Sequence, residues 1–137
     1  MVIAPALLDD VIAHAREEYD AECCGMIAYE QNGPAGSSRA VKVNRAKNVY
    51  PSPKRFEIDG KDVLRAINEF DDAGWEMGAI YHSHTHTAPY PSQTDINFAR
   101  NWPGVEWLIV GLAGKEPEVR SYLIEDGEVR EVPIEVG

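Results

Sequence analysis

The feature that most constrains this chain is a short apolar run, GAIY at residues 78–81, that ends in His82 and His84. The run predicts a buried strand, in which alternate side chains point to the same face of a sheet. His82 and His84 are therefore expected to point the same way from one strand end. A carboxylate from a following helix, Asp95, would complete a set of three ligands. Three protein ligands with one open position are typical of catalytic zinc, whereas structural zinc sites use four.

The spacing of the polar residues after this strand is specific. His82-x-His84 is followed, after seven residues, by Ser92-x-x-Asp95, and Glu22 lies far upstream, directly before a Cys-Cys-Gly-apolar run. This pattern resembles the JAMM (MPN+, Mov34) metalloprotease motif H-x-H-x7-S-x-x-D with its upstream glutamate. The surrounding residues are similar to a bacterial branch of that family, the one that includes sulfur-carrier-protein cysteine hydrolases.

The resemblance implies an α+β fold of the cytidine-deaminase-like JAMM/MPN type. It also implies a zinc metalloprotease in which His82, His84 and Asp95 hold Zn2+, Glu22 is the catalytic acid–base group, and Ser92 donates a hydrogen bond to the oxyanion. The implied reaction is amide hydrolysis at the C-terminus of a small ubiquitin-like sulfur-carrier protein with a Gly-Gly end, which releases cysteine.

Other functions stay open on the same residues. They are a generic isopeptidase or peptidase acting on other ubiquitin-like tails or short peptides, a non-catalytic MPN scaffold, and an iron oxygenase with two histidines and one carboxylate. The third histidine of the cluster, His86, is expected to line the cleft or face solvent.

Asp95 has a second interpretation. The run Ser92-Gln93-Thr94-Asp95 resembles a capping box, in which the carboxylate reaches back to the start of its helix. A carboxylate that points at an ion is expected not to do both. Metal binding is favoured because two histidines need a third ligand.

Length and cysteine content indicate the class of protein. With 137 residues, the chain is expected to form one domain, residues 1–137, that buries about two-thirds of its unfolded surface without disulfides. Cys23 and Cys24 are adjacent and cannot link distant elements, which favours a cytoplasmic location. The start of the chain does not resemble a signal peptide, and no apolar run approaches the about 20 residues that span a bilayer. No membrane association is therefore expected.

The net charge of −10 argues against nucleic-acid binding, because a phosphate backbone would be repelled. The charge is uneven, since residues 39–56 contain six basic side chains and no acid. This basic segment either docks an acidic partner or a substrate carboxylate, in which case reversing Lys42 and Arg45 would weaken binding, or forms a solvated face. The oligomeric state stays open, a dimer included.

Periodicity and turn residues predict a mixed sheet with a helix on each side and a third helix that carries the metal ligand. The first helix should bury a stripe from Leu8 to Tyr19 and leave His14 on the surface. The second should bury a stripe from Val63 to Phe70. A turn is expected at residues 31–33, and tryptophans 75, 102 and 107 are expected in the core. The expected strands are residues 1–3, 24–29, 40–43, 56–58, 76–82, 105–112, 118–124 and 128–136, and the expected helices begin near residues 5, 59 and 92.

Overall fold

The computed structural model describes residues 1–30 and 38–137, so the turn expected at residues 31–33 lies outside the described residues. The elements follow the expected order closely. They are β1 (Val2–Ile3), α1 (Pro5–Glu18), β2 (Cys24–Glu30), β3 (Ala40–Ala46), α2 (Gly60–Ala73), β4 (Trp75–His84), α3 (Gln93–Ala99), β5 (Glu106–Gly111), β6 (Glu118–Glu125), β7 (Glu128–Val132) and β8 (Glu135–Val136).

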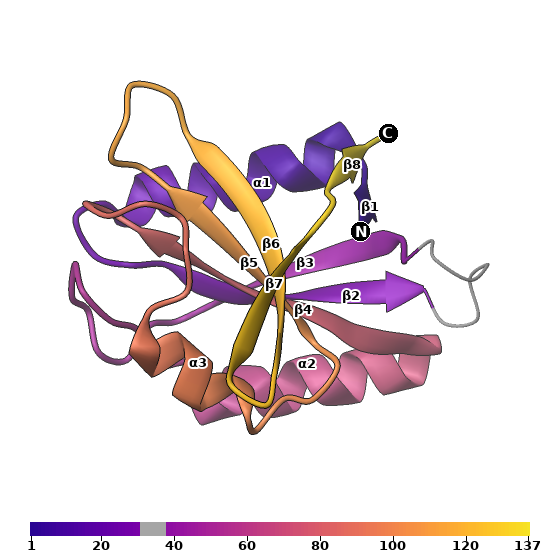
Figure 1. Ribbon diagram of the computed structural model, residues 1–137. Helices are drawn as coiled ribbons and strands as arrows, with labels where there is room; N and C mark the ends of the chain where they lie inside the picture. The colour runs from indigo at the N-terminus through magenta and orange to yellow at the C-terminus, as the bar shows by residue number, and fades with distance from the viewer. Residues whose placement is uncertain (31–37) are drawn as a thin grey trace.

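Six strands form one mixed sheet in the order β3-β2-β4-β5-β6-β7, and β1 pairs with β8 separately. Only β4 and β5 run parallel within the larger sheet; its other neighbouring strands are antiparallel. Figure 1 shows α1 on one side of this sheet and α2 and α3 on the other. The prediction of an α+β fold with a helix on each side of a mixed sheet is therefore confirmed. Among the described residues, none of the helices has the length and apolar character needed to cross a membrane.

A β-bulge interrupts the pairing of the central strand β4 with β2. Ile27 pairs with Ala79 but Ala28 pairs with Met77, so Gly78 is an extra residue in β4. The bulge changes the face to which side chains point. Met77 packs against the core cluster on the α2 side of the sheet, whereas Ala79 belongs to the cluster on the α1 side.

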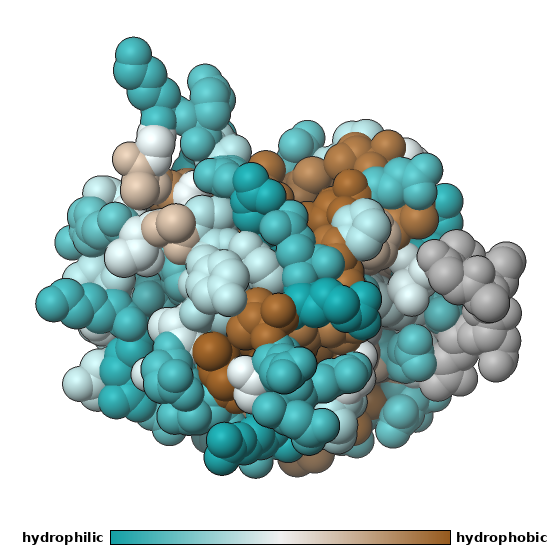
Figure 2. Space-filling view, viewed as in Figure 1, coloured by the Kyte–Doolittle hydropathy of each residue, from teal (hydrophilic) through white to brown (hydrophobic). Residues whose placement is uncertain are grey.

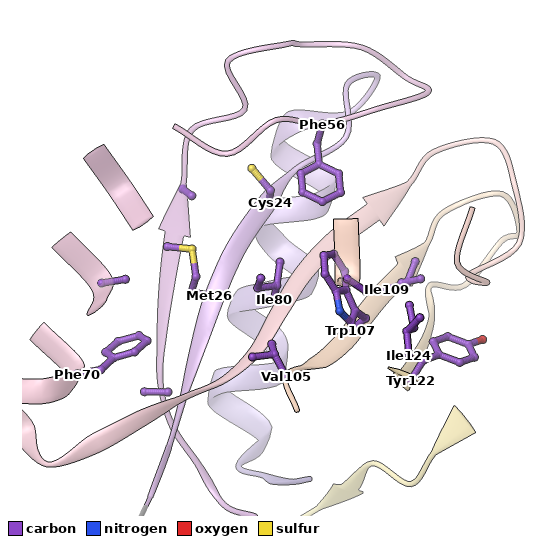
Figure 3. Packing of buried hydrophobic residues seen from close by; sticks show 14 residues of the cluster. Cys24, Met26, Phe56, Phe70, Ile80, Val105, Trp107, Ile109, Tyr122 and Ile124 are labelled. Atoms are coloured by element: carbon purple, nitrogen blue, oxygen red, sulfur yellow. The ribbon is translucent and has the colours of Figure 1, made fainter. Parts of the chain in front are cut away.

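Two apolar cores lie on opposite faces of the sheet. The core on the α2 side includes Met26, Ile80 and Trp107, and Figure 3 shows these side chains along the face of the strands, with Phe70 beside them. Trp107 is buried as expected, while Trp75 and Trp102 are only partly buried against this cluster.

The core on the α1 side contains a polar contact that the sequence did not predict. His14 was expected on the surface but is only 4% exposed, and its Nδ1 lies 2.8 Å from the Tyr81 hydroxyl. Burial lowers the pKa of His14. Tyr19 was expected in the buried stripe of the first helix, but it is the C-cap of α1 and is exposed.

Gly25 explains how the Tyr81 ring reaches His14. The two residues are paired across β2 and β4, and a Cβ atom at Gly25 would lie 2.3 Å from the ring of Tyr81. Because glycine has no Cβ, the ring can lie across β2 and reach the helix on that face.

Two further expectations are wrong for reasons of packing. In α2 the buried residues are Ala66 and Phe70, four positions apart, whereas Leu64 is 60% exposed and Ile67 is 37% exposed. The helix therefore presents a narrow stripe to the sheet. Residues 56–58 do not form a strand in the described part of the chain: Ile58 makes an isolated bridge with Asn48, and the Val49 N–H donates to the Glu57 carbonyl oxygen beside it.

Candidate functional site

The site residues predicted from the sequence gather at the carboxyl end of β4. His82 and His84 lie at the end of this strand, whose last residue is His84, and Asp95 is in the first turn of α3. Glu22 precedes β2, which runs antiparallel to β4 with Cys24 opposite His82. In Figure 1 the ends of β4 and β5 and the start of α3 lie at the same edge of the molecule.

The two imidazoles and the Asp95 carboxylate converge on one point. The Asp95 Oδ2 atom lies 3.0 Å from His82 Nε2 and 3.3 Å from His84 Nε2. The two Nε2 atoms are 3.1 Å apart, and all three side chains are buried. Two nitrogen ligands and one oxygen ligand directed at one point match a zinc site with an open position.

The backbone fixes the orientation of the His84 ring. His84 Nδ1 lies 2.9 Å from the carbonyl oxygen of Ala88. A carbonyl can only accept a hydrogen bond, so Nδ1 carries the hydrogen, and the Nε2 of the neutral ring keeps a free lone pair. Burial alone would lower the pKa of His84, but the hydrogen bonds to Asp95 and Ala88 raise it overall. The residues present therefore fit a cation at the point where the Nε2 atoms meet.

The His82 ring is held by packing. The Phe56 ring stacks on it with centroids 4.5 Å apart, and the edge of Trp107 lies on another side. Within residues 1–30 and 38–137, His82 Nδ1 has no hydrogen-bond partner. Apolar packing rather than a hydrogen bond thus orients this ligand. Phe56 was missed as a site residue because its place beside His82 depends on the path of the loop between β3 and α2.

The Asp95 carboxylate takes part in a capping box and also lies beside the two histidines. Ser92 is the N-cap of α3, its Oγ accepts from the Asp95 backbone N–H at 3.1 Å, and the Ser92 backbone N–H donates to Asp95 Oδ2 at 2.9 Å. The same Oδ2 also faces both histidines. Capping therefore does not turn the carboxylate away from the histidines, because one carboxylate oxygen can accept from more than one side. Although burial opposes it, the neighbouring imidazoles and the Ser92 N–H hold the pKa of Asp95 well below its ordinary range.

Glu22 faces the same point from the loop before β2. Its carboxylate lies within 4.8 Å of the ligand atoms of both histidines, and the residue is 5% exposed. Its backbone is fixed on both sides, since Glu22 N–H donates to Ser52 O and Glu22 O accepts from Asn48 Nδ2. Burial raises the pKa of Glu22 to about 8, with His84 opposing and Asp95 supporting the change. A carboxyl group of that pKa can both accept and donate a proton near neutral pH.

The two cysteines do not provide a nucleophile. Both are buried, and burial raises the pKa of the Cys23 thiol to about 12. The thiolate, which is the reactive form, is therefore scarce at neutral pH. Their packing in the two cores agrees with the expected structural role.

His86 lies on the rim and not among the converging ligands. Its Nε2 is 2.7 Å from Asp20 Oδ1, its ring contacts the edge of Tyr19 at 5.8 Å, and the side chain is exposed. The expectation that His86 lines the cleft or faces solvent agrees with this position. The contact joins the loop after β4 to the loop that carries Glu22.

Two side chains of the basic segment form ion pairs with acidic residues of the same chain. Lys42 is paired with Glu69, and Arg45 is paired with Asp10 and Glu17. The two residues singled out for docking are thus neutralised internally, whereas the Arg55 guanidinium lies over the Tyr50 ring at 4.2 Å.

Comparison with known proteins connects this geometry to a family. Residues 4–125 match the family described as prokaryotic homologs of the JAB domain. The chain is 36% identical over 139 residues to the CysO-cysteine peptidase of Mycobacterium tuberculosis, covering 99% of this chain and 90% of that protein. It is 34% identical over 116 residues to the desampylase of Pyrococcus furiosus, covering 84% and 76%. A solution structure of a Desulfitobacterium hafniense protein superposes with a TM-score of 0.87 at 28% identity, covering 99% of this chain and 92% of that one.

Proposed function

The chain belongs to the family of prokaryotic homologs of the JAB domain, and from this premise we propose that it is a zinc metallopeptidase. Its proposed reaction is hydrolysis of an amide bond at the C-terminus of a small ubiquitin-like sulfur carrier with a Gly-Gly end, with release of cysteine. The observation that carries the proposal is the convergence of His82 Nε2, His84 Nε2 and Asp95 Oδ2 beside the buried carboxylate of Glu22.

His82, His84 and Asp95 would hold the metal ion. When bound, zinc supplies Lewis-acid chemistry, which polarises the substrate carbonyl and lowers the pKa of water towards about 7. Asp95 is kept ionised for this role by its neighbours, and the Ala88 carbonyl keeps the His84 lone pair directed inward. These residues are therefore ready to bind a cation without rearranging.

Glu22 is the proposed proton carrier. Its carboxylate takes a proton from the attacking water and delivers it to the nitrogen of the leaving amine. Its burial suits this exchange, because bulk water does not compete for the proton. The hydrogen bonds from Asn48 and to Ser52 hold the backbone of Glu22 in place during the transfer.

Ser92 is the proposed donor to the developing oxyanion. Its Oγ accepts from the Asp95 N–H, which leaves the hydroxyl hydrogen to donate. Ser92 is exposed at the mouth of the site, where a substrate carbonyl can reach it. Loss of such a donor typically lowers the rate by about 10²–10³.

Two similarities support the substrate class. The CysO-cysteine peptidase supports release of cysteine from a carrier protein, and its match covers nearly the whole of both chains. The desampylase match supports the alternative, an isopeptidase that acts on other ubiquitin-like tails. The free, buried Cys23 and Cys24 are compatible with the reducing cytoplasm, where we place the reaction.

Intact mass spectrometry tests the proposal. A Gly-Gly-ended sulfur carrier that bears a C-terminal cysteine is incubated with zinc-loaded protein. The expected result is loss of one cysteine residue, which a chelator and the Glu22→Ala variant both block. The exposed Glu125→Gln variant is the matched control and should keep activity. An unchanged mass with protein shown to contain zinc would refute cysteine release, and cleavage of a lysine-linked conjugate would then favour the isopeptidase.

A further inference from the structure

We propose that Asn48 is a positioning residue that holds the loop between β3 and α2 against both Glu22 and His82. Asn48 lies two residues after the end of β3, at the start of this loop. It acts through the two site residues and not on the substrate. The proposal rests on the proposed function and deepens it by naming the group that fixes the proton carrier relative to the metal ligands.

The side-chain amide of Asn48 makes hydrogen bonds with both of its polar atoms. Oδ1 accepts from the backbone N–H groups of Tyr50 and Glu57, each at 2.9 Å. Nδ2 donates to the carbonyl oxygen of Glu22 at 2.9 Å and, over a longer 3.4 Å, to that of Arg55. A primary amide has two donor hydrogens and two acceptor lone pairs, so these bonds use all of them. This side chain therefore joins both arms of the loop to the segment that carries Glu22.

The bond to Glu57 fixes the arm of the loop that covers His82. Beside Asn48, the Val49 N–H donates to the Glu57 carbonyl oxygen at 2.8 Å, so the two arms of the loop pair at their base. The residue before Glu57 is Phe56, whose ring stacks on His82 with centroids 4.5 Å apart. A shift of Glu57 would therefore move the ring that orients this histidine.

The tip of the loop also contacts the site. The Ser52 carbonyl oxygen accepts from the Glu22 N–H at 2.8 Å, and the Thr85 hydroxyl donates to the Pro53 carbonyl oxygen at 3.0 Å. Thr85 is buried and directly follows His84. Figure 1 shows the loop at the edge where β4 ends, and Figure 2 shows that the surface along this edge is mostly hydrophilic. The loop thus faces water on its outside and is held to the site by hydrogen bonds on its inside.

Position matters most for the proposed proton transfer. A general base must lie within about 2.6–3.2 Å of the group whose proton it takes. Glu22 lies two residues before β2, and both hydrogen bonds of its backbone among the described residues are made with the loop. A misplacement of about 1 Å can lower a rate by about 10²-fold. Loss of the donor at Asn48 should therefore impair the chemical step and leave substrate binding nearly unchanged.

The test uses Asn48→Asp, which keeps the shape of the side chain and an acceptor for the two N–H groups of the loop but cannot donate to Glu22. The substrate is a Gly-Gly-ended sulfur carrier that bears a C-terminal cysteine. With zinc-loaded protein, we expect kcat to fall by about 10²-fold and KM to stay nearly unchanged. Asn44→Asp is the matched control, because Asn44 is on β3 and its Nδ2 donates to Glu69 Oε2 at 2.9 Å. The control should lower thermal stability and keep kcat.

Amide hydrogen exchange, followed by NMR, supplies a readout that does not depend on activity. In Asn48→Asp the Glu22 amide should exchange faster than in wild type, whereas the Tyr50 and Glu57 amides should stay protected. Asn48→Ala removes both kinds of bond and should speed exchange at all three amides. If Asn48→Ala does not fold, Asn48→Asp carries the test by itself.

The two readouts separate failure of the positioning role from failure of the reaction. The expected exchange pattern, without cysteine release by wild type, would refute the proposed function and keep Asn48 as the residue that fixes Glu22. Unchanged exchange at Glu22 in Asn48→Asp, an unchanged kcat in that variant of an active enzyme, or an equal loss of kcat in Asn44→Asp would overturn the role of Asn48.

Discussion

The buried carboxyl of Glu22 should make the metal-free protein less stable as the pH rises. Its pKa is about 8 in the fold, against an ordinary value of 4.5. The folded state therefore holds this proton more tightly than the unfolded state does. The stability that results is fully present below about pH 4.5 and is lost as the pH rises through about 8. Glu22→Gln keeps the shape of the side chain and cannot ionise, so it should remove this loss.

The magnitude follows from the two pKa values. Each pKa unit corresponds to about 1.4 kcal/mol, so the interval from 4.5 to about 8 corresponds to about 4–5 kcal/mol. The residue is almost fully buried, so solvent screening reduces this value little. The metal-free Glu22→Gln variant should thus gain stability over wild type by a few kcal/mol between pH 5 and pH 8.

Urea denaturation of chelator-treated protein at pH 5, 6.5 and 8 provides the measurement. Glu125→Gln, a change of the same kind at an exposed position, should follow wild type at every pH. Zinc should reduce the difference in unfolding free energy between Glu22→Gln and wild type, because a nearby cation favours the ionised carboxylate. A difference in unfolding free energy that does not change with pH would refute the reasoning.

Three further variants test other parts of the structure. Asp95→Ala should abolish stoichiometric zinc binding, measured by metal analysis after dialysis, because it removes the oxygen ligand; full zinc content would contradict the ligand set. Ser92→Ala should lower kcat by about 10²–10³ and unfolding free energy by about 1 kcal/mol; a stability loss with unchanged kcat would leave Ser92 only as a cap. Gly25→Ala should destabilise the protein by about 1–3 kcal/mol in thermal unfolding, because the new methyl group overlaps the Tyr81 ring. Gly60→Ala, where a Cβ meets nothing within 4 Å, is its control and should change stability by less than about 0.5 kcal/mol.

The sequence predicted the parts of the site that depend on local rules. Period-2 alternation placed His82 and His84 on one face, and the helix start signal at Ser92 placed Asp95 in the first turn of α3. The position of Glu22 beside them depends on the register of β2 against β4. Periodicity alone does not give that register, and the family motif supplied it.

The residues that were missed or misplaced depend on contacts between distant segments. His14 reads as a surface residue among charged neighbours, and only the Tyr81 hydroxyl from another element explains its burial. Phe56 reads as part of a strand but instead stacks on His82. Leu64 fits an apolar stripe, but α2 contacts the sheet along a narrower line than that stripe. In each case tertiary packing, which a single sequence does not display, decided the outcome.

The bulge at Gly78 sets how β4 tolerates insertions and deletions. Upstream of it Met77 faces the α2 side, and downstream Ile80 and the two histidine ligands face that same side. Removing Gly78 would restore simple alternation and leave Met77, Ile80 and the two histidines on the α2 side, because Met77 and Ile80 would then be two positions apart. That deletion would therefore keep both the α2-side core and the paired imidazoles, and would remove only the local bend and twist that the bulge gives β4. A one-residue deletion in the regular part of the strand is expected to be tolerated less readily: without Tyr81, Ile80 and His82 would be adjacent and would point to opposite faces.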